Sequence, residues 1–415
     1  MRAQASPLDV SALRAHFPGL ARMVAGRPAA FLDGPAGSQV PESVVFAMGR
    51  VMRDLAANTG GEFITSRGID ELVESAREAA AEFVGGTARE VAFGLNMTTL
   101  SFQLAHAVAR TLAKGDEIVV TDLDHDANIS PWLTVARDRE LVVKRAPIRA
   151  ADGTLDLDGL ESLLGPRTKV VAFTLASNAL GTVPPARRIT DAAHRVGALA
   201  VADAVHFAPH RRLDRTAVGA DAVLCSPYKF FGPHAGLLSI REDLAASLPV
   251  DRVRPASEEP PGHRFETGTP SFEALAGICA AIEYIAALGS GASRRERLDS
   301  AFARIEAHEA ALSRRALARA AELPGARVHG ITDPARLAER TPTFCMTFEG
   351  RTARSVSAAL GERGVFTWWG HYYAIAVMEA LQLQSSGGGL RAGFLHYNTL
   401  EEVDRLFEEL ADILR

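Results

Sequence analysis

The chain has 415 residues, of which 47% are hydrophobic and 23% are charged, and its formal net charge is −5. This balance is typical of a globular protein, and the length predicts two or three domains. The negative charge and the scattered basic residues argue against a nucleic-acid partner, and no apolar run is long enough to span a membrane. Three cysteines without metal-ligand spacing indicate neither a disulfide framework nor a metal site, and they predict a cytoplasmic protein.

The first twenty residues contain no apolar signal core, and they predict a short helix at the start of the chain. A series of short apolar segments then predicts strands at 117–121, 141–144, 170–175, 198–202, 222–225 and 237–240. Helical patterns, such as those at 156–164 and 189–196, separate most of them, which favours a largely parallel sheet covered on both faces. Only a loop joins the last two strands, so we expect that pair to be antiparallel.

A second pattern begins with one long, charged, alanine-rich helix at 293–323. A strand at 343–348, a helix at 353–362, a strand at 390–394 and a helix at 400–414 follow it, and together they predict a smaller α+β unit. We therefore divide the chain into three parts. These are an N-terminal segment (1–30) that packs on the small domain, a large domain (31–288) that binds the cofactor, and a small C-terminal domain (289–415).

Polar side chains follow four of the predicted strands at the point where each strand ends. They are His125, Asn178, Asp203 with His206, and Ser226 with Lys229. Ligands in open α/β sheets bind at the carboxyl ends of the strands, so we expect these side chains to lie close together. Taken singly, His125 is better explained as an ordinary loop histidine and Asp203 as a helix N-cap. Their shared placement favours a site.

Lys229 lies in the segment CSPYKFFGPHAG (225–236), between aromatic residues and glycines. A lysine in apolar surroundings has a lowered pKa and becomes a nucleophile toward carbonyl groups, although its stem could also simply cover apolar neighbours. Thr98 and Thr99 precede an amphipathic helical stretch at 100–112. They are explained either as N-cap residues or as a phosphate site at a helix N-terminus.

Pyridoxal phosphate needs this whole set of residues, because it presents an aldehyde, a ring nitrogen and a phosphate. We assign Lys229 to the Schiff base and Asp203 to the ring nitrogen. His125 is assigned to stacking on the ring, and His206 or Asn178 to the ring oxygen. The phosphate would be held by Thr98, Thr99 and Ser226.

The sequence resembles the class V, fold-type I pyridoxal-phosphate enzymes, and in particular the cysteine desulfurase and selenocysteine lyase branch. The segments that resemble this family occur in family order at 31–41, 96–105, 124–132, 176–185, 201–206, 226–236, 264–277 and 390–406. The resemblance implies a large domain with a mostly parallel seven-stranded sheet between helices, and a small C-terminal α+β domain. It supports the roles given to Lys229, Asp203 and His125.

Two further residues take their roles from the resemblance. Thr269 is implied to reach the phosphate bound by the neighbouring subunit, which implies a homodimer. Arg391 is implied to pair with the carboxylate of a small amino-acid substrate, a task that suits a planar guanidinium.

The chain departs from the desulfurase pattern at several positions. His206 replaces a glutamine, and Tyr228, which we count among the cofactor-binding residues, replaces a histidine. Desulfurases place their catalytic cysteine at the end of an R-x-G-H-H-C pattern, where this chain has Trp368-Trp369-Gly370-His371-Tyr372-Tyr373. The substrate-binding residues are then Arg391, Asn178, Trp368, His371, Tyr372 and Tyr373. The missing cysteine predicts that no persulfide forms by the usual route.

We therefore expect a pyridoxal-phosphate enzyme that acts on an α-amino acid, with Lys229 as the base at Cα, and we prefer elimination at Cβ or cleavage of a C–S bond. His371, Tyr372 or Tyr373 would protonate the leaving group. Transamination and racemisation use the same core residues and stay open as alternatives. A non-catalytic scaffold of sulfur-transfer machinery is the third alternative, and the retention of Lys229, Asp203 and Arg391 argues against it.

Overall fold

The computed structural model describes residues 7–415. Its main sheet has seven strands in the spatial order β4-β12-β11-β10-β9-β5-β6. Their bounds are β4 (Val91–Gly94), β5 (Glu117–Thr121), β6 (Val142–Ala146), β9 (Thr168–Thr174), β10 (Leu199–Asp203), β11 (Ala222–Cys225) and β12 (Gly236–Ile240). β11, β10, β9, β5 and β6 are parallel, whereas β12 is antiparallel to both of its neighbours. The mostly parallel sheet and the antiparallel pair β11–β12 are thus confirmed, and the short edge strand β4 was missed.

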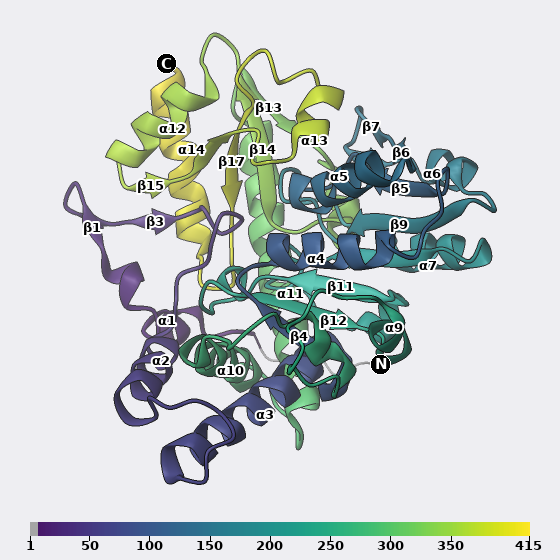
Figure 1. Ribbon diagram of the computed structural model, residues 1–415. Helices are drawn as coiled ribbons and strands as arrows, with labels where there is room; N and C mark the ends of the chain where they lie inside the picture. The colour runs from purple at the N-terminus through teal and green to yellow at the C-terminus, as the bar shows by residue number, and fades with distance from the viewer. Residues whose placement is uncertain (1–6) are drawn as a thin grey trace.

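Two separate cores cover the two faces of this sheet (Figure 1). Successive residues of a strand point to opposite faces, so in β9 Val171 and Phe173 enter one core while Val170 and Ala172 enter the other. One face is covered by α4 (Met97–Ala109) and α5 (Ser130–Arg139). The other is covered by α3 (Ile64–Val84), α7 (Ala186–Arg195) and α10 (Phe272–Ala287). This double burial explains why the strands are continuous apolar runs.

The C-terminal part of the chain forms an antiparallel sheet in the order β13-β14-β17-β16. The strands are β13 (Ala326–His329), β14 (Thr343–Phe348), β16 (Trp368–Gly370) and β17 (Gly389–Gly393). Three helices pack around it, namely α11 (Arg294–Ala321), α12 (Ala353–Glu362) and α14 (Leu400–Leu414). A capping box between Ser293 and Glu296 begins α11, close to the predicted helix start. The predicted smaller α+β unit is confirmed.

The described part of the N-terminal segment contains α1 (Val10–Arg14), β1 (Met23–Val24) and β2 (Arg27–Pro28), and it runs alongside α14 (Figure 1). Arg14 pairs with Glu402 at 3.0 Å and Arg27 with Glu409 at 3.5 Å, both on α14. The next strand, β3 (Ala30–Phe31), pairs with β15 (Val365–Phe366) of the small unit. Residues 1–6 of the predicted segment lie outside the described residues, and the three-part division of the chain stays a prediction.

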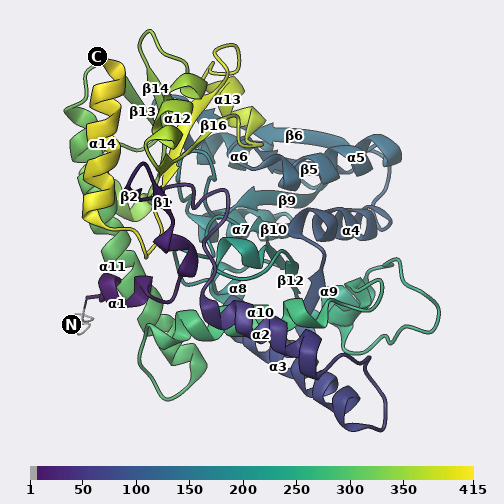
Figure 2. The same ribbon diagram turned by 90° about the vertical axis from the view of Figure 1, so that its left-hand side faces the viewer.

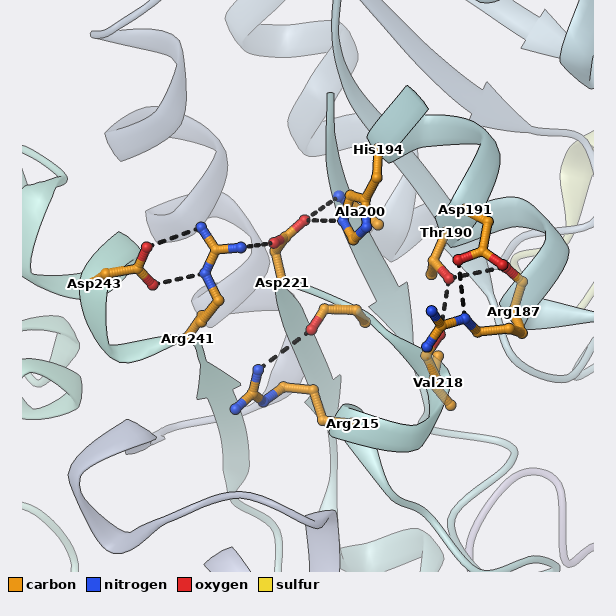
Figure 3. A network of polar contacts seen from close by, with 11 residues as sticks. Arg187, Thr190, Asp191, His194, Ala200, Arg215, Val218, Asp221, Arg241 and Asp243 are labelled. Atoms are coloured by element: carbon orange, nitrogen blue, oxygen red, sulfur yellow. Dashed lines mark hydrogen bonds and ion pairs between the residues drawn. The ribbon is translucent and has the colours of Figure 1, made fainter. Parts of the chain in front are cut away.

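A polar network around the buried carboxylate of Asp221 links several elements at the end of the sheet opposite to the predicted site (Figure 3). Asp221, directly before β11, accepts hydrogen bonds from the Ala200 N–H at 2.7 Å and from Arg241 at 2.7 Å. Its second partner side chain is His194 at 3.0 Å. Both carboxylate oxygens are therefore paired, and they link α7, β10 and β11 to the start of α9 (Glu242–Ser247). Within residues 7–415, no helix combines the length and the apolar character needed to cross a membrane.

Candidate active site

A cavity of about 930 Å³ lies where the carboxyl ends of β9, β10 and β11 meet β16 and β17 of the small unit. Its volume is within the range of small-molecule sites. The predicted residues that line it are Thr98, His125, Asn178, Asp203, His206, Ser226, Tyr228, Lys229, Trp368, His371, Tyr372, Tyr373 and Arg391. Two predicted residues, Thr99 and Thr269, do not line it. In the part of the chain that the structure describes, no cluster of His, Cys, Asp or Glu is arranged to hold a metal ion.

Lys229 ends the short 3₁₀ turn Pro227–Lys229 that follows β11. Its Nζ donates hydrogen bonds to the carbonyl oxygens of Pro35 and Ala36, the latter at 2.9 Å. Burial lowers the pKa of Lys229 to about 7, and the charge of Arg391 acts in the same direction, against the carboxylates of Asp203 and Asp33. A large fraction of the amine is therefore uncharged near neutral pH, which is the form that attacks a carbonyl group.

The lysine loop is fixed by its contacts with residues 35–38. The Ser38 hydroxyl donates to the Tyr228 carbonyl oxygen at 3.0 Å and accepts from the Phe231 N–H at 2.8 Å. Phe231 has a φ of 72° although it is not a glycine, and its side chain is fully buried. Tyr228 stacks on His234, with ring centroids 4.7 Å apart. These contacts hold the amine in place at the floor of the cavity.

Asp203 is the last residue of β10, and one of its oxygens accepts a hydrogen bond from the Val205 N–H at 2.8 Å. Burial raises its pKa to about 6, and the Val205 N–H and the charge of Lys229 oppose this rise. The carboxylate is therefore mostly ionised at neutral pH and can pair with a protonated ring nitrogen.

His125 lies between β5 and α5, and its Nδ1 accepts a hydrogen bond from the Ala127 N–H at 3.0 Å. Its ring stacks with Tyr373 at a centroid distance of 5.5 Å and an interplanar angle of 23°. Burial lowers its pKa to about 4, with the charges of Lys229 and Arg391 adding to the effect. The imidazole is therefore neutral, and a neutral flat ring suits stacking against a bound ring.

At the N-terminus of α4, the two predicted threonines have different surroundings. Thr98 lines the cavity. The N–H and the hydroxyl of Thr99 both donate to the side-chain oxygen of Asn96, at 2.8 and 3.0 Å, so Asn96 is the N-cap. The Met97 N–H donates to the Ser226 hydroxyl at 3.3 Å. A Cβ at Gly236 of β12 would lie 2.5 Å from the Asn96 backbone, so only glycine permits this close approach.

His206 and Asn178 are both tied to residues from the far end of the chain. Nε2 of His206 lies 3.2 Å from the Thr341 hydroxyl and 3.0 Å from the Thr343 hydroxyl. Burial holds the pKa of His206 well below its usual range, so its ring is neutral. The Asn178 amide donates to the Tyr372 carbonyl oxygen at 2.9 Å, and its own side-chain oxygen is buried without a partner.

Arg391 lies on β17 with an exposure of 4%. Its guanidinium donates to the Asn178 carbonyl oxygen at 3.0 Å and lies 4.4 Å from the centre of the Tyr372 ring. Burial lowers its pKa to about 10, which leaves it charged at neutral pH. Its Nε has no hydrogen-bond partner. A buried donor on a charged group is costly when unpaired, so this arrangement favours an anionic ligand.

The loop after β16 closes one side of the cavity, and hydrogen bonds to other segments hold it in place. The Tyr373 carbonyl oxygen accepts from the Asp126 N–H at 2.7 Å, and the Tyr372 hydroxyl donates to the Gly389 carbonyl oxygen. Tyr372 and Tyr373 have φ values of 54° and 56°, a region that bulky residues rarely adopt. Such strain is found where the surrounding structure holds a functional loop in place.

None of the described residues that line the cavity is a cysteine. Cys225 and Cys345 are fully buried in strands, and Cys279 lies in α10. Burial raises the pKa of Cys345 to about 12 and that of Cys279 to about 11, so neither is a thiolate at neutral pH. Thr269 is exposed and lies outside the cavity of its own chain.

Sequence reasoning missed Asp33, one oxygen of which is buried without a partner. Burial raises the pKa of Asp33 to about 6, against the charges of Arg391 and Lys229. Sequence reasoning also missed the carbonyl groups of Pro35 and Ala36, which accept hydrogen bonds from Lys229. All three lie in the segment FLDGPAGSQVP (31–41), whose resemblance to the family was the available signal, although no role followed from it.

Known proteins resemble the chain over its whole length. The profile of the Aminotransferase class-V family matches residues 30–406. The chain is 33% identical to "Probable cysteine desulfurase 2" of Mycobacterium leprae, over 99% of this chain and 97% of that protein. It is 32% identical to "Probable cysteine desulfurase 1" of the same species, where it spans 64% of the relative's length. The apo structure of a cysteine desulfurase from Thermococcus onnurineus has a TM-score of 0.87, at 26% identity, with 99% of each chain covered.

The residues of the cavity fit pyridoxal phosphate, the cofactor of this family. An amine of lowered pKa matches its aldehyde, a buried carboxylate matches its ring nitrogen, and a helix N-terminus next to a serine hydroxyl matches its phosphate. The unpaired Nε of Arg391 and side-chain oxygen of Asn178 leave polar groups for further bound atoms. Cavity and comparisons agree, and the chain belongs to the class V family of pyridoxal-phosphate-dependent enzymes.

Proposed function

We propose that the enzyme cleaves the bond between Cβ and a leaving group, preferably sulfur, in an α-amino acid, and that it does so without an enzyme-bound persulfide. The observation that supports this most strongly is the composition of the cavity. It combines an amine of lowered pKa with a buried arginine, and no cysteine is among the described residues that line it. The cysteine desulfurases among the relatives support a sulfur-containing substrate.

In this proposal Arg391 binds the substrate carboxylate through its unpaired Nε, and its contact with the Asn178 carbonyl oxygen fixes the guanidinium. Lys229 would hold the cofactor aldehyde in the resting enzyme, and its amine would take the proton from Cα during the reaction. Pyridoxal phosphate, when bound, supplies a ring that accepts the negative charge left at Cα.

The other residues hold the cofactor in place. Asp203 would pair with the ring nitrogen and His125 would lie against the ring. Thr98 and Ser226 would bind the phosphate, and His206 or Asn178 the ring oxygen. The neutral state of His125 and His206 and the ionised state of Asp203 support these roles.

Two of the three predicted proton donors stay available for the leaving group. The Tyr372 hydroxyl already donates to the Gly389 carbonyl oxygen, and burial holds its pKa well above the usual range. Nδ1 of His371 accepts a hydrogen bond from the Tyr373 N–H at 3.0 Å, which leaves Nε2 of that ring as the nitrogen that carries a proton. We therefore assign assistance of the leaving group to His371, whose Nε2–H would donate a hydrogen bond to it, with Tyr373 beside it at the mouth of the cavity.

We also propose that the enzyme is a homodimer in which Thr269 reaches the phosphate of the partner's site. Exposed apolar side chains support a second copy as the partner, because Val45 and Met52 lie seven residues apart on α2 (Glu42–Asp54), and Phe63 and Ile64 lie at the start of α3. Figure 2 shows that α2 lies beside α10. The four apolar side chains are exposed to solvent. Light scattering that gives the mass of one chain would contradict this proposal.

A panel of amino acids tests the reaction, with sulfide, free thiol, pyruvate, alanine and keto acids all measured. The proposal predicts thiol or sulfide together with pyruvate and ammonia, and the loss of all of these products in Lys229→Ala. Alanine formed together with sulfide would show that a persulfide route operates. A keto acid formed while the cofactor accumulates in its amine form would show transamination, and inversion of the substrate without product would show racemisation.

A further inference from the structure

The cavity contains an aromatic surface next to Arg391 that neither cofactor binding nor recognition of the substrate carboxylate uses. Trp368 on β16 lies directly opposite Arg391 on β17 in the antiparallel register. Residues directly opposite in such a pair project from the same face, with Cβ atoms about 4.5–5.5 Å apart. A carboxylate bound to Arg391 therefore places the rest of the substrate beside the indole of Trp368.

This surface leads outward to the mouth of the cavity. Across the small sheet, Cys345, Arg391 and Trp368 form one row, and their exposures are 0%, 4% and 51%. Tyr373, which stacks on His125, is 64% exposed and lines the same cavity. Large aromatic side chains that stay exposed inside a cavity favour an apolar ligand that covers them.

The charges around the cavity restrict this ligand further. Among the described lining residues the only Lys or Arg side chains are Lys229 and Arg391, and both are already assigned. A second negative charge on the substrate would find no free cation there, and the carboxylate of Asp126 also lines the cavity. The side chain of the substrate is therefore not negatively charged.

We infer that the substrate is a cysteine thioether whose sulfur bears an aromatic or large apolar group, and that Trp368 and Tyr373 form the subsite for that group. This inference rests on the proposed elimination and names its substrate class. Lys229 removes the Cα proton, the Cβ–S bond breaks with its electron pair going to sulfur, and the thiolate, which accepts a hydrogen bond from Nε2–H of His371, takes its proton from water. Addition of water to the remaining three-carbon fragment yields pyruvate and ammonia, so the reaction needs no oxidant or reductant.

The holoenzyme tests this inference with S-benzylcysteine and S-methylcysteine, which share the bond that breaks and differ in the group on sulfur. We expect kcat/KM to be at least about tenfold higher for S-benzylcysteine, since filling an apolar pocket is worth about 10-fold or more. Trp368→Ala should lower kcat/KM for S-benzylcysteine far more than for S-methylcysteine and so remove this preference, and Trp368→Phe should restore most of it.

Trp369→Ala is the matched control, because it removes an indole at the next position of the same strand. Trp369 also lines the cavity, but it lies opposite Leu390 instead of Arg391, and the guanidinium of Arg354 lies 5.3 Å from its ring. The control should change the preference far less than Trp368→Ala. An equal change in both variants would attribute the effect to damage of β16 and would overturn the inference.

A binding measurement gives a readout that does not depend on turnover. 3-Phenylpropionate has the carboxylate and the ring but no amine or sulfur, and its affinity for the holoenzyme by calorimetry should fall in Trp368→Ala. The affinity for propionate should not change. Thiol and pyruvate formed equally well from both thioethers would overturn this inference and leave the proposed elimination intact. If neither thioether yields thiol but 3-phenylpropionate binding still depends on Trp368, the proposed elimination would be rejected. The assignment of Trp368 to an apolar subsite would then still stand.

Discussion

The two ends of β11 carry two buried polar regions of opposite character. At the amino end, every oxygen of the Asp221 carboxylate is paired, with partners from α7, β10 and the start of α9 (Figure 3). At the carboxyl end, the Nε of Arg391 and the side-chain oxygen of Asn178 are buried without a partner. Both regions lie at ends of the same parallel sheet. They differ in how many of their polar groups have hydrogen-bond partners.

This difference separates a structural site from a binding site. A satisfied buried network contributes to folding, whereas unpaired buried groups cost stability and are retained where a ligand completes them. Changes at the Asp221 end should therefore affect unfolding and leave activity intact. Changes at the Lys229 end should affect activity and leave folding intact.

The largest effect is expected from Lys229→Ala. It removes the amine that we propose holds the cofactor and takes the Cα proton, so turnover should fall by about 10³-fold or more. The visible absorbance of bound cofactor should also be lost. Thermal unfolding of the cofactor-free variant should not be weakened, because the variant no longer buries an amine whose pKa is lowered. Turnover within tenfold of wild type would contradict the assigned role.

Arg391→Lys should lower kcat/KM by about 100-fold, because an ammonium cannot reproduce the planar contact with a carboxylate while it also donates to the Asn178 carbonyl oxygen. Cofactor absorbance should be kept, and most of the effect should appear in KM. A variant that binds substrate normally but no longer binds cofactor would show that Arg391 serves the cofactor instead.

Asp221→Ala should lower the free energy of unfolding by about 2 kcal/mol, because it leaves the buried Ala200 N–H unpaired while His194 and Arg241 remain partly accessible to water. Activity of the folded variant should stay within about twofold of wild type. Asp243→Ala, which removes the exposed partner of Arg241, should cost about 0.5 kcal/mol or less. Chemical denaturation measures both values. Similar losses in the two variants would show that the buried Asp221 carboxylate contributes no more to stability than the exposed Asp243 carboxylate.

The last prediction is a pH dependence in the uptake of cofactor by the free protein. The pKa of Lys229 is about 7, so the amine loses its proton near neutral pH instead of near 10.5. The uptake rate should fall about tenfold per pH unit below 7 and level off above it. Asp33→Asn removes a negative charge that raises this pKa and should move the inflection to lower pH. A rate that keeps rising up to pH 10 would contradict the lowered pKa.

Much of this arrangement could be predicted, because local sequence determines where buried strands end. The continuous apolar runs predicted as strands at 117–121, 170–175, 198–202 and 222–225 correspond to β5, β9, β10 and β11, and residues that follow them do meet in one cavity. Thr99 could not be placed in this way. Its sequence position next to Thr98 fits a phosphate site equally well, and only the folded helix shows that its N–H and hydroxyl are taken by Asn96.

Other features depend on contacts between segments far apart in the chain. The carbonyl groups of Pro35 and Ala36 hold Lys229 across more than 190 residues. The Tyr372 hydroxyl donates its hydrogen bond to the Gly389 carbonyl oxygen, so it is not available as a proton donor. The charge of Asp33 raises the pKa of Lys229, although the two residues lie far apart in the sequence.

By itself, the sequence determined the succession of most strands along the chain and the kinds of side chain at their ends, since hydrophobic periodicity and turn residues act locally. Only the tertiary structure decided which of those side chains have partners, because each partner comes from a distant segment. That pairing distinguishes the satisfied Asp221 carboxylate from the open guanidinium of Arg391.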